Sequence, residues 1–245
     1  MKKSLLFTLL MLPLAVAAQS DFGLWTSVSA EKKVGKKLGL GLESDFRSRN
    51  DFRTADRLGL GIDANYKITK QLKTSVGYTF LYNNRKEKIT YHDDGSYNNW
   101  RPSYRAPRHR IYADLTGTAA IGRLTLSLRE RWQYTYRPTK TTTRYDFDNA
   151  CWEQTTVNSR SKQLLRSRLK AEYDIPHCKI TPYVTGELFN GWALEKTRLT
   201  TGADWKINRQ NSVALYYRYQ SVTENDGDDD DTTRHFLGLN YKIKF

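Results

Sequence analysis

The side chains of this 245-residue sequence that could do chemistry are mostly charged, and they recur at every second position of segments whose other positions are apolar. Arg166, Arg168 and Lys170 show this spacing, and residues two apart in an extended chain project from the same face. A face lined with cations attracts anionic solutes. The basic residues of this face are Arg110, Arg129, Arg131, Arg166, Arg168, Lys170, Arg198, Lys206 and Arg218, and its acidic residues are Glu43, Asp45, Asp63, Asp114, Glu172, Glu187 and Asp204.

A nucleophile and a base fall near each other toward the C-terminus. If the last hairpin is centred near Asp228, Ser221 faces His235, and a serine beside a histidine base could attack a lipid ester. Outer-membrane phospholipases resemble this arrangement, but their local His-x-Ser pattern is absent and no orienting Asn or acid is identifiable. Lipid hydrolysis is therefore an alternative function, and no catalytic residue is assigned.

Six carboxylates between Glu224 and Asp231 could attract calcium, which prefers oxygen ligands. Their spacing lacks the pattern of a calcium-binding loop, so the segment is interpreted as a solvated hairpin tip. No zinc, phosphate-binding or dinucleotide-binding motif occurs in the sequence. We therefore expect no metal site and no cofactor.

The two cysteines, Cys151 and Cys178, are predicted to be free thiols. A predicted strand from about residue 160 to 173 separates them, and its extended residues span about 46 Å at 3.3 Å each. Disulfide-bonded Cα atoms lie within about 7 Å of each other. A bridge between the two cysteines would therefore contradict the predicted topology.

The last eleven residues, 235–245, indicate which elements carry the charged side chains. Apolar residues alternate there with polar or small ones, which is the pattern of a strand with one face in lipid and one in water. The same alternation recurs along most of the chain, and after Gln19 no stretch approaches the roughly 20 apolar residues of a transmembrane helix. The sequence predicts an all-β protein, a transmembrane up-and-down antiparallel β-barrel of ten to twelve strands, with the charged face lining the lumen.

Connection lengths predict the orientation, because outer-membrane barrels have short periplasmic turns and long external loops. From Leu38 to Phe245 the pattern gives ten strands, which start and end on the periplasmic side. The segment 22–30 also alternates, and it either pairs in the barrel or lies in the lumen or periplasm. Short turns are expected at 69–71, 119–123, 174–179 and 208–211, and longer polar connections at 48–56, 84–104, 137–159 and 221–233.

Aromatic residues group at the ends of the predicted strands, as amphipathic rings do at the level of lipid headgroups. A soluble β-sandwich also alternates, but it does not predict this grouping. Glu130 falls on the lipid-facing side, which indicates a bulge or a position near the headgroups, with a lateral opening or partner contact as the alternative. The expected aromatic girdle comprises Tyr66, Trp132, Tyr134, Tyr173, Trp192, Trp205, Tyr217 and Phe245.

The N-terminus has the features of a secretory signal. Lys2 and Lys3 precede an apolar run over 5–16 and small residues before Gln19, so 1–18 is predicted to be cleaved, leaving 19–245 as one barrel domain. The formal net charge of the sequence is +14. Such a charge could suggest nucleic acid, but export excludes that partner and leaves anionic lipids and solutes.

The stretch from Lys32 to Tyr82 resembles a Bacteroidota outer-membrane family catalogued as domain of unknown function 2490. The features that carry the resemblance are Trp25, a Leu-Gly-Leu-Gly-Leu-Glu segment with Arg47, Asp56-Arg57-Leu58, Tyr66-Lys67-Ile68 and Gly77-Tyr78-Thr79-Phe80-Leu81-Tyr82. The resemblance implies a barrel in the outer membrane of a Gram-negative bacterium, over essentially the whole mature chain. It implies no activity and no site.

These observations predict a monomeric outer-membrane barrel that is surrounded by lipids and lipopolysaccharide and inserted by the barrel-assembly machinery. We expect a narrow pore or a lumenal binding barrel with a bias toward small anionic solutes, because rings of Arg and Lys favour anions. Barrels of ten to twelve strands lie between filled and open interiors. A structural or partner-binding barrel without transport is therefore the first alternative, and a lipid-modifying hydrolase is the second.

Overall fold

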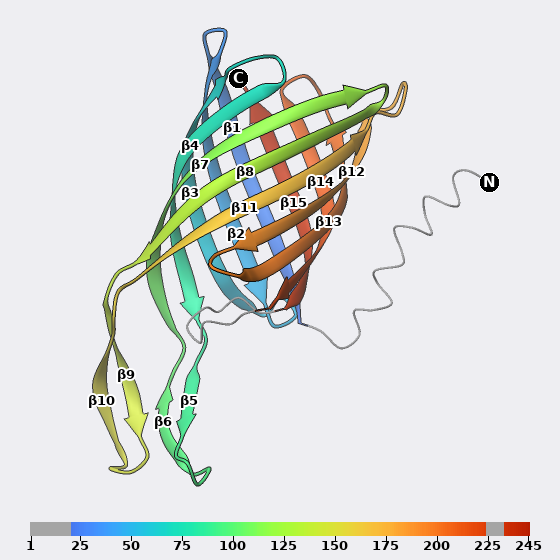
Figure 1. Cartoon of the computed structure of the whole chain (residues 1–245). Coiled ribbons are helices and arrows are strands. Elements are labelled where there is room, and N and C mark those ends of the chain that lie inside the picture. Colours follow the sequence, from blue (N-terminus) through green and yellow to red (C-terminus); the bar gives the residue numbers. More distant parts are fainter. Residues whose placement is uncertain (1–20, 224–232) are drawn as a thin grey trace, which may run out of the picture.

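The computed structural model describes residues 21–223 and 233–245, so the predicted signal segment and the carboxylates of 224–231 lie outside the described residues. No helix among the described residues is long and apolar enough to cross a membrane. Eleven strands close into a barrel (Figure 1). They are β1 (Phe22–Val34), β2 (Leu38–Arg49), β3 (Thr54–Lys67), β4 (Leu72–Arg85), β7 (Tyr104–Ile121), β8 (Leu124–Arg137), β11 (Arg160–Tyr173), β12 (Ile180–Asn190), β13 (Leu194–Lys206), β14 (Asn211–Val222) and β15 (Arg234–Lys244).

The barrel closes between its first and last strands. β1 pairs in parallel with β15, from Phe22 opposite His235 to Glu31 opposite Lys244, and its other edge pairs antiparallel with β2. In an up-and-down barrel, an odd number of strands leaves the first and last strands running the same way, so their pairing must be parallel. The predicted barrel is confirmed, and its eleven strands fall within the predicted range of ten to twelve. The segment 22–30 is a strand of the wall.

The parallel seam places the two ends of the barrel chain on opposite sides. Phe22 stacks on His235 where the chain enters β15, with 5.5 Å between the ring centroids. At the other end, the backbone N–H of Phe245 donates to the carbonyl of Glu31 at 2.8 Å. The ten strands from Leu38 to Phe245 do begin and end on one side, but β1 adds a crossing.

The wall is apolar outside and polar inside. Leu60 and Leu215 on the outer face are 62% and 63% exposed, whereas Gln220 and Arg234 on the inner face are 1% and 2% exposed. This distribution is the reverse of that in a soluble protein, and it matches a wall with lipid on one side and a polar lumen on the other.

Two of the connections predicted as loops are mostly strand. β5 (Lys88–Tyr91), β6 (Tyr97–Arg101), β9 (Lys140–Asp146) and β10 (Cys151–Val157) form a second sheet in the order β10-β9-β6-β5. This sheet extends beyond the barrel at the end away from the C-terminus (Figure 1). The predicted polar loops at 84–104 and 137–159 are therefore corrected to two hairpins. The connection expected at 48–56 is also shorter, because β2 runs to Arg49 and β3 starts at Thr54.

Glu130 occupies a regular position in the middle of β8. It pairs with Leu115 on one side and Ser167 on the other, and neither pairing has a register shift there. The hydroxyl of Ser167 donates to a Glu130 carboxylate oxygen at 2.7 Å. Of the two explanations predicted for Glu130, the bulge is wrong, and the position near the headgroups stays a prediction. The hydroxyl of Ser167 partly compensates the outward carboxylate.

Candidate functional site: the barrel lumen

The inner face of the wall encloses a cavity of about 610 Å³. All eleven barrel strands contribute residues to its lining because every second residue of each strand points inward. Seventeen of the lining residues are Lys or Arg and eight are Asp or Glu. The cavity wall therefore carries a large excess of positive charge.

Most of the charged residues predicted for the lumen lie in this cavity wall. The exceptions are Lys206, which is exposed at the end of β13, and Glu172 of β11. Glu172 accepts an ion pair from cavity-lining Lys170 at 2.6 Å. The predicted residues that line the cavity are Arg110, Arg129, Arg131, Arg166, Arg168, Lys170, Arg198, Arg218, Glu43, Asp45, Asp63, Asp114, Glu187 and Asp204.

Glu187 of β12 is the most heavily compensated anion of the lumen. Its Oε1 accepts hydrogen bonds from Arg129 and Arg166, each at 2.9 Å, and Arg198 Nη1 lies 3.7 Å from Oε2. The side chain of Glu187 is 10% exposed. Three guanidinium groups from three strands thus share one buried carboxylate, which ties β8, β11 and β13 to β12 along one side of the wall.

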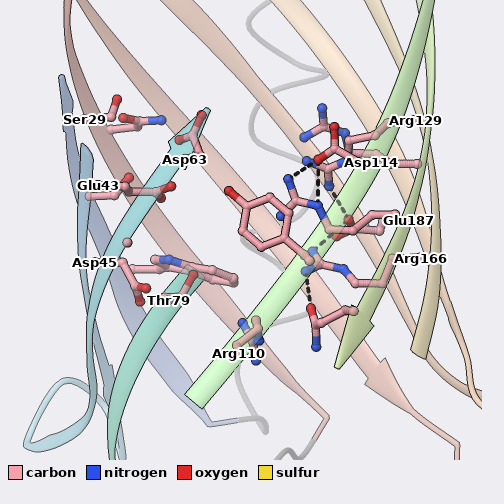
Figure 2. Close-up of a pocket in the computed structure, with 18 of the residues that line it drawn as sticks. Ser29, Glu43, Asp45, Asp63, Thr79, Arg110, Asp114, Arg129, Arg166 and Glu187 are labelled. Carbon is pink, nitrogen blue, oxygen red and sulfur yellow. Dashed lines mark hydrogen bonds and ion pairs between the residues drawn. The ribbon is translucent and has the colours of Figure 1, made fainter. Parts of the chain in front are cut away.

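Three acidic residues of the wall lie opposite this cluster, whereas Asp114 lies on the same side as the arginines. Figure 2 shows Glu43, Asp45 and Asp63, from β2 and β3, on one side of the lumen, and Arg129 and Arg166 on the other. Such an arrangement creates a transverse field, with a negative arc facing a positive one. A solute in the cavity would therefore be oriented as well as attracted.

Trp25 of β1 is a lumen residue that the sequence reasoning missed. Two guanidinium groups contact its ring, with the central carbon of Arg47 at 3.1 Å and that of Arg218 at 4.0 Å from the ring centroid. Cations stack on the negative face of an indole. The sequence contains a signal for this position, because Trp25 alternates in step with the small polar residues Ser27 and Ser29 and therefore lies on the same face of the strand.

Three of the lining arginines have no carboxylate within ion-pair distance among residues 21–223 and 233–245: Arg110, Arg168 and Arg218. Arg110 and Arg218 contact the hydroxyls of Thr135 and Thr200 instead. The Nε of Arg168 is buried and has no hydrogen-bond partner in that part of the chain. These guanidinium groups retain the capacity to bind an anion.

The remaining candidate residues lie outside the lumen. His235 pairs with Tyr219, two residues away from Ser221, and its Nδ1 contacts the hydroxyl of Tyr217, so the predicted serine–histidine pairing is wrong. The free thiols are confirmed: Cys151 lies in the β9–β10 hairpin and Cys178 in the turn after β11, at opposite ends of the molecule. The girdle aromatics that are exposed on the wall or at strand ends include Tyr66, Trp132, Tyr173, Trp192, Trp205 and Phe245, while Tyr134 and Tyr217 are half-buried.

Two solved structures resemble this chain in fold. The beta domain of the Bordetella autotransporter Brka matches with a TM-score of 0.56 and 13% identity, covering 88% of this chain and 86% of that chain. The NanC porin matches with a TM-score of 0.48 and 11% identity, covering 92% of this chain and 100% of that chain. At 13% identity the likeness to the autotransporter beta domain shows the fold alone, and this fold is the closed transmembrane-type β-barrel described above.

The family follows from the sequence match. The model of a family described as "Protein of unknown function (DUF2490)" matches residues 22–233, and the chain belongs to this family. The predicted resemblance is therefore confirmed. No curated protein matches the sequence.

Proposed function

We propose that this protein is an outer-membrane barrel whose lumen takes up small anionic solutes, as a narrow pore or as a binding cavity. The observation that carries the proposal is the composition of the cavity wall, seventeen Lys or Arg against eight Asp or Glu. In a low-dielectric wall such an excess raises the local concentration of anions. The proposal includes export by a cleaved signal over 1–18, insertion by the barrel-assembly machinery as a monomer, and contact with lipopolysaccharide.

A structural or partner-binding barrel without transport is the second candidate, and the ion pairs between neighbouring strands of the lumen wall favour it. Arg131 pairs with Asp114, Arg57 with Asp45 at 3.4 Å, and Glu187 with its three arginines. Trp25 projects into the same space. These groups narrow the passage, so charge alone does not decide between conduction and binding.

Planar-bilayer recording separates the two candidates. Under a KCl gradient, a pore produces stepwise currents whose reversal potential indicates anion selectivity, whereas repeated electrically silent insertions count against transport. Arg168→Ala removes a lining cation that has no carboxylate partner in the described chain, so it should lower anion selectivity or anion binding. Lys206→Ala is the matched control, because this lysine does not line the cavity. Equal effects of the two substitutions would contradict a specific role for the lumen charge.

A further inference from the structure

The two hairpins beyond the barrel take up the register of its wall, which β5–β6 keeps as far as a bulge between Thr90 and Tyr91. In one ribbon, Arg85 opposite Tyr104 at the end of β4–β7 is followed by Lys88 opposite Arg101 in β5–β6. In the other, Arg137 opposite Arg160 is followed by Lys140 opposite Val157 in β9–β10. Each face of a hairpin is therefore the continuation of one face of the barrel wall.

The chemistry of the two faces inverts where the barrel ends. On β4, outward Val76 and Tyr78 are apolar and inward Ser75 is polar. On β5, the even-numbered positions continue the outward face of β4 and carry Lys88 and Thr90. The odd-numbered positions continue its lumen-side face and carry Ile89 and Tyr91. On the second ribbon, Tyr145 and Trp152 likewise follow the parity of the lumen-lining residues. The outward face thus becomes polar where lipid no longer covers it.

Six rings form a continuous surface on the lumen-side face of this second sheet. We call this surface the aromatic platform. Neighbouring centroids lie between 5.1 and 5.6 Å apart along the series, which crosses from β5 to β10. In order, the platform consists of Tyr91, Tyr97, Phe147, Tyr145, Trp152 and Trp100.

The platform is both open and fixed in place. Tyr91, Tyr97 and Trp152 are 54–56% exposed. The indole N–H of Trp100 donates to Glu87 at 3.0 Å, and the backbone N–H of Phe147 donates to the carbonyl of Asn98 at 3.0 Å, which joins the two hairpins. Exposed aromatic clusters of this kind mark binding surfaces.

The composition of the platform indicates the chemistry of its ligand. Five of its six rings are Tyr or Trp, whose faces are apolar while their edges hydrogen-bond. The phenol groups of Tyr91, Tyr97 and Tyr145 make no hydrogen bond within the described part of the chain. A surface for acyl chains would need no hydroxyls. A pyranose ring presents an apolar C–H face and a rim of hydroxyls, which matches both features.

The charge of the hairpins also distinguishes them from the lumen. Segments 86–103 and 138–159 contain five Lys or Arg and six Asp or Glu, whereas the lumen has a strong basic excess. Recognition on the platform therefore depends on ring stacking rather than on attraction of anions. We propose that the aromatic platform is a binding site for neutral saccharides at the end of the barrel, independent of whether the lumen takes up anions.

Isothermal titration calorimetry tests the proposal. The purified full-length barrel in detergent is titrated with maltohexaose, cellohexaose and chitohexaose. At least one saccharide should bind, and Trp152→Ala should weaken its affinity at least tenfold. Trp205→Ala is the matched control, because it removes an exposed indole from the opposite end of the barrel, and it should change affinity less than twofold. The heat-dependent shift in electrophoretic mobility reports whether each variant retains a folded barrel.

A second pair of substitutions protects the test against misfolding of the hairpins. Tyr91→Ser removes a terminal ring of the platform, and Lys88→Ala changes an exposed residue on the polar face of the same strand. The first should weaken binding and the second should not. The proposal would be overturned if none of the three saccharides binds, or if Trp152→Ala and Tyr91→Ser leave the affinity unchanged. It would also be overturned if a partner protein binds the platform and no saccharide competes with it. Anion conductance is expected to be the same in all these variants.

Discussion

Replacing Glu187 by Gln is predicted to destabilise the barrel by about 3–5 kcal/mol, the range for removing one partner of a buried charge network. The carboxylate is 10% exposed and lies 2.9, 2.9 and 3.7 Å from Arg129, Arg166 and Arg198. The amide keeps the shape of the side chain but removes its charge. Three neighbouring guanidinium groups then repel one another without a shared anion.

Urea unfolding of the barrel in lipid vesicles, followed by tryptophan fluorescence, measures this loss. An added anion that binds in place of the carboxylate should restore stability, by about 2.7 kcal/mol at 100 times its Kd, so sulfate should stabilise Glu187→Gln more than the unmodified protein. Glu172→Gln is the control, because this carboxylate is 30% exposed and has a single ion pair, which is worth about 1 kcal/mol or less. The reasoning is refuted if the two variants lose equal stability or if sulfate gives Glu187→Gln no advantage.

Three further perturbations test the lumen, the seam side of the wall and the orientation. Trp25→Ala removes a ring that two guanidinium groups contact, so the free energy of unfolding should fall by about 3–5 kcal/mol and any single-channel conductance should rise; an unchanged conductance would show that the ring does not restrict the passage. Gly238→Val places a side chain where the ring of Tyr216 lies, which should destabilise the barrel by about 1–3 kcal/mol, and the loss should shrink when Tyr216 is also replaced by Ala. A membrane-impermeant maleimide applied to intact cells should label Cys151 and spare Cys178, and the reverse pattern would invert the orientation.

Period-two alternation was sufficient to predict the wall and most of its inner surface from the sequence. Because the backbone of a strand alternates strictly, parity alone assigned Arg166 and Arg168 to the lumen side, where the structure places them. The alternation says which face of a strand a side chain lies on, but not which other side chains it contacts inside the lumen. The convergence of three arginines on Glu187 depends on the shear of the barrel and the lengths of the side chains. Sequence reasoning could therefore name these residues but could not assemble them.

The last hairpin shows the same limit at smaller scale. The Ser221–His235 hypothesis needed the register of β14 on β15, and the centre of the connecting segment was assumed to be Asp228. The strands instead pair Tyr219 with His235, a difference of two residues. A shift of two keeps every side chain on its predicted face while it changes every cross-strand neighbour. Facial assignments are therefore more robust than pairings.

The placement of the first strand was left open by the sequence for a similar reason. The alternation in β1 identified a strand but not its partner, and the rule of even numbers favoured ten strands from Leu38. A parallel seam has no local sequence signature, since its two strands lie at opposite ends of the chain. Its hydrogen bonds use the free edges of β1 and β15, which would otherwise be exposed to lipid without partners. The energetic cost of that exposure, rather than any motif, explains why the first segment joins the wall.

The inversion of parity beyond β4 and β8 is a signal that sequence reasoning could have used. Ile89 and Tyr91 are apolar on the parity where β4 is polar, and Tyr145 and Trp152 show the same change on the other ribbon. Where the hairpin keeps the register of the wall, such a change indicates that the surroundings of the strand change, because each face takes the chemistry of its surroundings. Alternation that persists while its phase inverts therefore marks the level at which strands leave the membrane, and it identifies the projecting hairpins as structured rather than as polar loops.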